Sequence, residues 1–206
     1  MPITFNGTAG TISGIGTDGV AAGNINETAL PDNVATGVKM GYAGAIVQTQ
    51  VVNSTTRVTA AGSSMAEVSS SYRVSITPLF SNSVMLISYH IPTGWGGDWA
   101  ANYVMRVSAK RFVSGTAQDI SSVGVTNGSR TLVAGYHQRP GNGYDTNDMQ
   151  VWAYQVIDLP NTTSTIQYGF HASQEGGTVY YGYSNSDNGS WGWDSNIVIM
   201  VQEIKQ

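Results

Sequence analysis

The chain has 206 residues, which is enough for one or two domains and one sizeable core. Charged residues make up only 11% of it, against roughly 25% in average soluble domains, so hydroxyl and amide groups must solvate much of the surface. A net charge of -4 with scattered cations excludes the clustered Lys and Arg of nucleic-acid-binding domains. No apolar run reaches the roughly 18 residues of a membrane span. We therefore expect neither a nucleic-acid nor a membrane partner.

Residues 1 to about 43 are rich in Gly, Ala, Thr and Asn, and their apolar residues recur too sparsely for a helix face. Such a segment buries too little surface to fold alone, so it is either disordered or ordered along a partner. The sequence GIGTDG at 14–19 matches a dinucleotide-binding fingerprint but lacks the preceding strand and following helix. We favour an extended attachment arm whose apolar side chains follow a partner surface: Ile3, Phe5, Ile12, Ile15, Ile25 and Leu30.

Residues 44–206 are predicted to form one domain of short strands with Gly, Asn and Asp in the turns. In Tyr103–Val113 apolar and polar residues alternate, which assigns Arg106, Ser108 and Lys110 to the solvent side. Parallel sheets would need crossover helices that the pattern lacks, so we expect an all-β fold, an antiparallel β-sandwich of the jelly-roll kind. The expected strands are Ile46–Val52, Tyr72–Thr77, Val84–Ile91, Tyr103–Val113, Thr131–His137, Met149–Ile157, Thr165–Ala172, Thr178–Tyr183 and Asn196–Ile204.

The closing stretch SNIVIMVQEIK, residues 195–205, would be apolar on both faces as a strand. Its second face must be covered by something other than its own core, and Met149–Ile157 shows the same mixed pattern. The sequence leaves open which row of the closing strand faces the core, that of Ile197 or that of Val198. We expect the second face to be an obligate subunit interface, with these residues in it: Val198, Met200, Trp152 and Tyr154.

No catalytic or metal-binding signature stands out in the sequence. The three histidines fall on different predicted strands, and none has a carboxylate or a second histidine at ligand spacing. Acidic residues in the loops could supply the carboxylate pair of a glycoside hydrolase, but nothing selects two of them. Backbone hydrogen bonding in turns explains these Asp residues more simply. We therefore expect no enzyme activity, no metal and no cofactor.

Aromatic residues concentrate in GWGGDWAANY at 94–103 and in the stretch from Tyr180 to NGSWGWDS. Such rings stack on sugar faces while neighbouring Asn and Asp bind sugar hydroxyls, so they predict a glycan site. The same rings would equally suit an interface anchor or a lid on the core. The residues concerned are Trp95, Trp99, Tyr181, Tyr183, Trp191 and Trp193.

Three stretches resemble virion proteins of tailed phages, of the kind found in cyanophages and marine phages. TAGTISGIG with GNINETALPDNV resembles the Gly-rich attachment segments that precede fibre domains. RVSITPLFSNSVMLISYHI resembles a recurrent strand, turn and strand of such domains, and SNIVIMVQEI resembles their closing strand. The resemblance implies a C-terminal β-sandwich, often a homotrimer, displayed on a capsid or tail.

Because the chain has no long repetitive shaft, the resemblance favours a homotrimeric capsid decoration or cement protein, a knob anchored by its N-terminal arm. Its expected partners are copies of itself and the major capsid protein or other virion proteins. Its expected location is the virion, after synthesis in the host cytoplasm. The alternative is a tail-fibre or tail-appendage protein that binds host surface glycan through its aromatic loops.

Overall fold

The computed structural model describes residues 4–6, 11–13, 43–96, 103–120, 135–139, 149–184 and 194–206. The chain divides into two units, Met1–Met40 and Gly41–Gln206. In the first unit, β1 (Thr4–Asn6) pairs with β2 (Thr11–Ser13) in antiparallel fashion. Phe5 lies opposite Ile12 in this pair. The other four arm residues, Ile3, Ile15, Ile25 and Leu30, lie outside the described residues.

The second unit is built from short strands, and its described residues include no α-helix. A 3-10 turn, Ser70–Tyr72, lies among these strands. The Ser69 hydroxyl caps it by accepting a hydrogen bond from the Ser71 amide. The strands are β3 (Ile46–Ser54), β4 (Val58–Ala60), β5 (Ala66–Glu67), β6 (Val74–Ile76), β7 (Val84–Gly96), β8 (Tyr103–Val113), β9 (Thr116–Asp119), β10 (Gly135–Arg139), β11 (Met149–Asp158), β12 (Ile166–Glu175), β13 (Thr178–Tyr181) and β14 (Ile197–Ile204).

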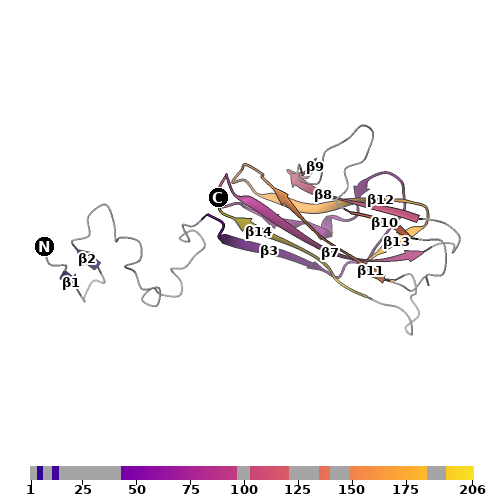
Figure 1. Cartoon of the computed structure of the whole chain (residues 1–206), viewed down its shortest axis with the longest axis horizontal. Coiled ribbons are helices and arrows are strands. Elements are labelled where there is room, and N and C mark those ends of the chain that lie inside the picture. Colours follow the sequence, from indigo (N-terminus) through magenta and orange to yellow (C-terminus); the bar gives the residue numbers. More distant parts are fainter. Residues whose placement is uncertain are drawn as a thin grey trace. The chain divides into compact units, whose positions relative to one another are not determined.

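Two antiparallel sheets form the sandwich, and Figure 1 shows them as two layers. One contains β3, β14, β7 and β11 side by side, with β13 and β4 extending it beside the far end of β7. The other contains β6, β12, β8 and β10, with β5 on β12 and β9 on β8. The eight main strands can be numbered 1 to 8 in chain order: β3, β6, β7, β8, β10, β11, β12 and β14. In this numbering the strand orders of the two sheets are 1-8-3-6 and 2-7-4-5, which is jelly-roll topology. The prediction of an all-β antiparallel sandwich is confirmed.

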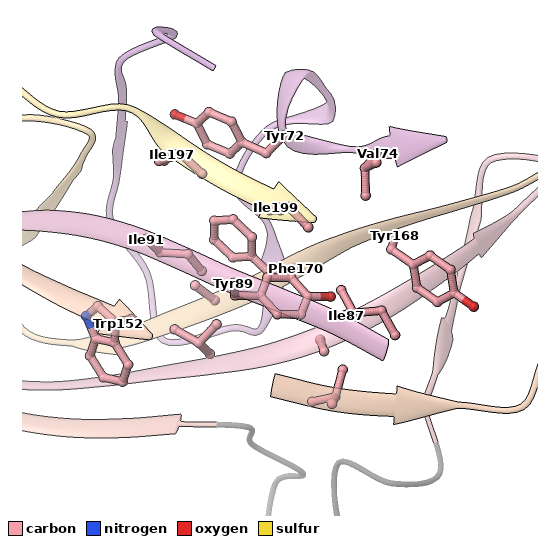
Figure 2. Packing of buried hydrophobic residues seen from close by; sticks show 14 of the residues in the cluster. Tyr72, Val74, Ile87, Tyr89, Ile91, Trp152, Tyr168, Phe170, Ile197 and Ile199 are labelled. Atoms are coloured by element: carbon pink, nitrogen blue, oxygen red, sulfur yellow. The ribbon is translucent and has the colours of Figure 1, made fainter. Parts of the chain in front are cut away.

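The core lies between the sheets because alternate residues of each strand point inward (Figure 2). Tyr89 of β7 stacks on Tyr154 of β11 with ring centroids 4.6 Å apart. Its hydroxyl donates to the Gly169 carbonyl of β12 at 3.0 Å, so it ties one sheet to the other. Tyr72 stacks on Phe170 at 5.8 Å at the β12 side of the core. Large aromatic rings therefore fill the space between the layers and also join them.

A buried ionic contact also joins the two sheets. Asp158, at the end of β11, is only 3% exposed and accepts hydrogen bonds from the Arg111 guanidinium of β8 at 2.9 and 3.2 Å. The Tyr168 hydroxyl of β12 donates to the same carboxylate at 2.8 Å. Burial raises the pKa of Tyr168 above its ordinary value, and the nearby Asp158 charge raises it further. Both charges are paired within the protein, as burial requires.

A second buried carboxylate fixes the closing strand. Glu203 of β14 is fully buried and accepts hydrogen bonds from the backbone amides of Leu79 and Phe80 at 2.9 and 3.1 Å. Ser83 Oγ at 2.6 Å and Gln48 Nε2 at 2.5 Å also donate to it. Burial alone would raise the pKa of Glu203, but these hydrogen bonds together hold it below its ordinary value. The charged carboxylate thus organises the turn between β6 and β7.

Candidate functional site: the outward face of the β3-β14-β7-β11 sheet

The closing strand β14 alternates strictly between buried and half-buried residues. Ile197, Ile199 and Val201 are fully buried, so this row faces the sandwich core. Val198 and Met200 form the outward row and are half-buried. This settles the orientation that the sequence left open, and it leaves the apolar outward row covered by no other layer of the described chain.

The β11 residues proposed for a subunit interface lie on the opposite side from the one expected. Trp152 is 9% exposed in the core, with Nε1 donating to Thr93 Oγ1 at 3.1 Å, and Tyr154 stacks on Tyr89. The assignment of Trp152 and Tyr154 to an interface was therefore wrong. In β11 the large aromatic rings take the inward positions, where they bury the most area, and the smaller Val151 and Ala153 point outward.

The outward side chains of four adjacent strands form one continuous surface, which we call the aliphatic face. By register, Val198 lies between His90 of β7 and Asn53 of β3, and Met200 lies between Ser88 and Val51. The outward residues of β11 continue these rows across β7. The members are Ile46, Thr49, Val51, Asn53, Val84, Leu86, Ser88, His90, Val151, Ala153, Gln155, Ile157, Val198, Met200, Gln202 and Ile204.

Exposed apolar side chains concentrate on this face. Among the described residues six large hydrophobic side chains are exposed, and four of them belong to it, namely Ile46, Val51, Val151 and Ile157. Val51 and Val151 are each more than half exposed. Leu159, a fifth, directly follows β11. Scattered apolar residues are normal on a protein surface, but here the half-buried Leu86, Val198 and Met200 of β7 and β14 lie between the exposed residues of β3 and β11. An apolar surface of this extent marks an interaction site.

The aliphatic face contains no Asp, Glu, Lys or Arg. Its polar members are hydroxyls and amides together with His90, which is exposed. Two of them, Gln155 and Ser88, are cross-strand partners whose side chains hydrogen-bond at 2.9 Å. Without fixed charges, removing the face from water costs little beyond re-pairing these neutral groups. The same lack of charge leaves it no group that would anchor a charged ligand.

The outward face of the other sheet is different, and we call it the ion-pair face. Arg73 binds Glu67 of β5 in bidentate fashion, at 2.6 and 2.7 Å, and lies 3.8 Å above the Phe112 ring. The hydrogen bond to Glu67 raises the pKa of Arg73 above its ordinary value. Arg106 pairs with Glu175 at 2.6 Å, and Lys110 pairs with Asp119. The two outward surfaces of the sandwich thus have opposite chemistry.

Of the aromatic residues proposed for a glycan site, the structure describes Trp95, Tyr181 and Tyr183. Trp95 and Tyr181 are buried in the core, 3% and 0% exposed, so they are corrected from surface to core residues. Trp99, Trp191 and Trp193 lie outside the described residues. Trp95 was misjudged because Gly94 and Gly96 suggested a loop, whereas β7 continues through them and pairs with β13.

Tyr183 remains half-buried at the surface, in a group that we call the tyrosine cluster. Its ring meets that of Tyr180 edge-on, with centroids 5.1 Å apart, and its hydroxyl bonds Thr59 Oγ1 at 2.5 Å. The Arg57 guanidinium lies 5.5 Å from the Tyr183 ring and forms an ion pair with Asp194. An aromatic surface beside an exposed cation and carboxylate has the elements of a sugar-binding surface.

In the described part of the chain, no group of three His, Asp or Glu side chains is placed to hold a metal ion. His90 belongs to the aliphatic face and His171 to the ion-pair face. Burial lowers the pKa of His171, and the neighbouring Lys110 lowers it further. Within the described residues no helix is long and apolar enough to cross a membrane.

No protein-family model matches the chain, and no curated protein matches it in sequence. Fifteen chains of solved structures match it in fold. One comes from the structure of the infectious bursal disease virus Gt strain, with 8% sequence identity and a TM-score of 0.34. The match covers 77% of this chain and 37% of that one, so this chain spans well under two thirds of that protein's length.

Proposed function

We propose that the protein is a structural, non-catalytic component of a virus particle, a homotrimeric capsid decoration or cement protein. The observation that carries the proposal is the asymmetry of the sandwich, with one outward face aliphatic and free of charged residues and the other covered with ion pairs. Jelly rolls serve in viral capsids as well as in lectins and enzymes, so the fold alone does not fix the function. The resemblance of three stretches to tailed-phage virion proteins selects the viral role.

In this proposal the two units have separate tasks. Residues 1–43 attach the protein to the particle by ordering along the major capsid protein or another virion protein. The sandwich forms the knob, and three copies pack together through an apolar surface. Low charge and abundant hydroxyl and amide groups suit a protein that works inside a crowded assembly.

Locating the protein on particles tests the proposal. Antibodies raised against residues 44–206 and coupled to gold should label the capsid surface of intact particles in electron micrographs. Light scattering on the purified full chain should give about three times 21.8 kDa. Gold on the tail alone would favour the alternative below. Antigen found only in the soluble lysate, with particles unlabelled, would refute a virion role.

The tyrosine cluster favours a second candidate, a tail protein that binds host surface glycan. Tyr180 and Tyr183 offer aromatic surface, and Arg57 and Asp194, with side chains 48% and 58% exposed, are available to sugar hydroxyls. On a glycan array the protein should then retain host-type polysaccharide, and Tyr180→Ala should reduce the retention at least tenfold. Tyr180 is the variant of choice because Tyr183 also has a structural hydrogen bond to Thr59. No retention of any glycan would remove this candidate.

A further inference from the structure

We propose that the aliphatic face is the surface through which copies of this chain bind one another. The inference rests on the proposed function in that it names the contact surface of the proposed homotrimer. It replaces the aromatic residues of β11 by the outward rows of all four strands, with β14 and β7 at the centre.

The aliphatic face is chemically self-complementary. A face with fixed charges meets like charges when it packs on its own copy, and such contacts are costly. The aliphatic face has no Asp, Glu, Lys or Arg to create that cost. Its Ser, Thr, Asn and Gln side chains each carry both donor and acceptor capacity, so the same groups on a second copy can satisfy them. A strongly charged partner would find no counter-charge on this face.

The aliphatic face is also large enough for a specific interface. Four strands spaced about 4.8 Å apart, each contributing about eight residues at about 3.4 Å, span roughly 500 Å² of flat surface. Two such faces packed on each other about a twofold axis remove about 1,000 Å², which is the lower limit for a specific interface, and three faces that meet on a threefold axis remove about 1,500 Å² in total. Nearly all of that area is apolar or neutral, and the more-than-half-exposed Val51 and Val151 add relief beyond the flat estimate.

The charged groups of the other broad surface are already paired within the chain. On the ion-pair face, Arg73, Arg106 and Lys110 each have a carboxylate partner within the chain. Packing that face against another copy would desolvate these ions without supplying new partners. Self-association through the aliphatic face avoids this cost.

A matched pair of charge insertions tests the inference on the full chain. Val198→Lys places a cation on the aliphatic face, and Val104→Lys places one on the ion-pair face, where Glu175 lies opposite. Both positions are half-buried valines on strands paired at both edges. By light scattering at micromolar concentration, wild type and Val104→Lys should give the same oligomer mass. Val198→Lys should give a folded 21.8 kDa monomer, with circular dichroism unchanged and association weakened at least tenfold.

Gln155→Lys keeps the test decisive if Val198→Lys does not fold, because Gln155 is exposed on the same face. The chain has no cysteine, so single-cysteine variants add a direct readout of contact. A short bis-maleimide should join two copies of Met200→Cys and leave Gln167→Cys, on the ion-pair face, unjoined. Wild type that is monomeric, or a Val198→Lys protein that keeps the wild-type mass, would overturn the inference. Equal dissociation by Val104→Lys would overturn it as well.

These outcomes are separable from those of the proposed function. A protein that assembles through the aliphatic face but does not label particles keeps this inference and removes the virion role. If the protein labels particles but Val198→Lys leaves its oligomer mass unchanged, the virion role is kept and this inference is removed. If the wild-type protein is a dimer and Val198→Lys makes it monomeric, the aliphatic face is supported as the contact surface, and only the proposed trimer is contradicted.

Discussion

Replacing Glu203 by glutamine should destabilise the sandwich strongly although it changes only one atom. The carboxylate is fully buried and accepts hydrogen bonds from the Leu79 and Phe80 amides, from Ser83 and from Gln48. A glutamine amide keeps one acceptor oxygen and turns the other into a donor that faces donors. At least one buried donor then loses its partner, and the remaining contacts lose the charge that strengthens them.

The magnitude follows from these contacts. An unpaired buried donor costs about 1–3 kcal/mol, and hydrogen bonds to a charged acceptor contribute about 1.5–3 kcal/mol. We expect Glu203→Gln to lower the free energy of unfolding by about 3 kcal/mol. For a domain of this size about 1 kcal/mol corresponds to 2–4 °C, so the melting temperature should fall by about 6–12 °C.

The pH dependence gives a second signature of the same group. Because the folded protein holds the pKa of Glu203 below its ordinary value, the stabilisation is complete above about pH 4.3 and is lost as pH falls through the folded pKa. The acid loss of stability should therefore be shallower in Glu203→Gln than in wild type.

Urea denaturation followed by circular dichroism, at one protein concentration and from pH 7 to pH 3, measures both effects. Glu175→Gln is the matched control, because that side chain is 55% exposed in a surface ion pair and should cost less than about 1 kcal/mol. If Glu203→Gln unfolds at the same urea concentration as Glu175→Gln, the buried carboxylate does not organise the turn as argued.

Three further predictions concern the layers of the sandwich. Asp158→Asn leaves Arg111 without its buried counter-charge and should lower the free energy of unfolding in urea by about 3 kcal/mol. Its control, Lys110→Met, breaks the surface pair with Asp119 and should lower it by less than about 1 kcal/mol. Gly169→Ala places a Cβ 3.2 Å from the Phe112 ring and should cost about 1 kcal/mol; an unchanged urea midpoint would show that the ring yields freely. Burial raises the pKa of several tyrosines, so stability should fall above about pH 10, where these residues ionise only in the unfolded chain. Of the eleven tyrosines, Tyr72, Tyr89, Tyr168 and Tyr181 should ionise only as near-ultraviolet dichroism is lost, so part of the absorbance rise near 295 nm should coincide with that loss. A rise equivalent to all eleven tyrosines before the loss would contradict this.

Alternation in the sequence located the main strands to within a few residues, although Tyr72 and Arg73, predicted to begin a strand, form a 3-10 turn and its C-cap before β6. The bounds predicted for Tyr103–Val113 are those of β8, and Arg106 and Lys110 lie on its outward side as expected. The very short strands β4, β5 and β9 were missed because two to four residues are too few to show a period. The positions of β4 and β5 also depend on partners far along the chain, β13 for β4 and β12 for β5.

The orientation of β14 could not be predicted for a specific reason. Both rows of this strand are apolar, and the charged Glu203 would suggest that its own row points outward. The row of Glu203 is buried because two backbone amides and a serine hydroxyl of the segment before β7 donate hydrogen bonds to its carboxylate. A local rule failed where a long-range hydrogen-bond network was stronger.

In β11 a related ambiguity concealed the candidate site. Large aromatic residues alternate there with small apolar ones, and the aromatic rings attracted the interface assignment because such residues anchor many interfaces. Trp152 and Tyr154 instead complete the core, where Tyr154 stacks on Tyr89. The signal that identifies the aliphatic face is the absence of charge from the alternate positions of four strands, which becomes visible only once the strand order is known.

Strand order also explains why the two faces differ in chemistry. The strands with clear polar alternation, such as β8, lie in the sheet whose outward side carries the ion pairs. The strands with apolar residues on both faces, β14 and β11, lie in the other sheet, on either side of β7. A sandwich that only had to stay soluble would gain from charges on both sides. An aliphatic, neutral surface across four strands lowers solubility unless copies of the chain cover it by binding one another. The low charge of the chain therefore fits its proposed role in an assembly.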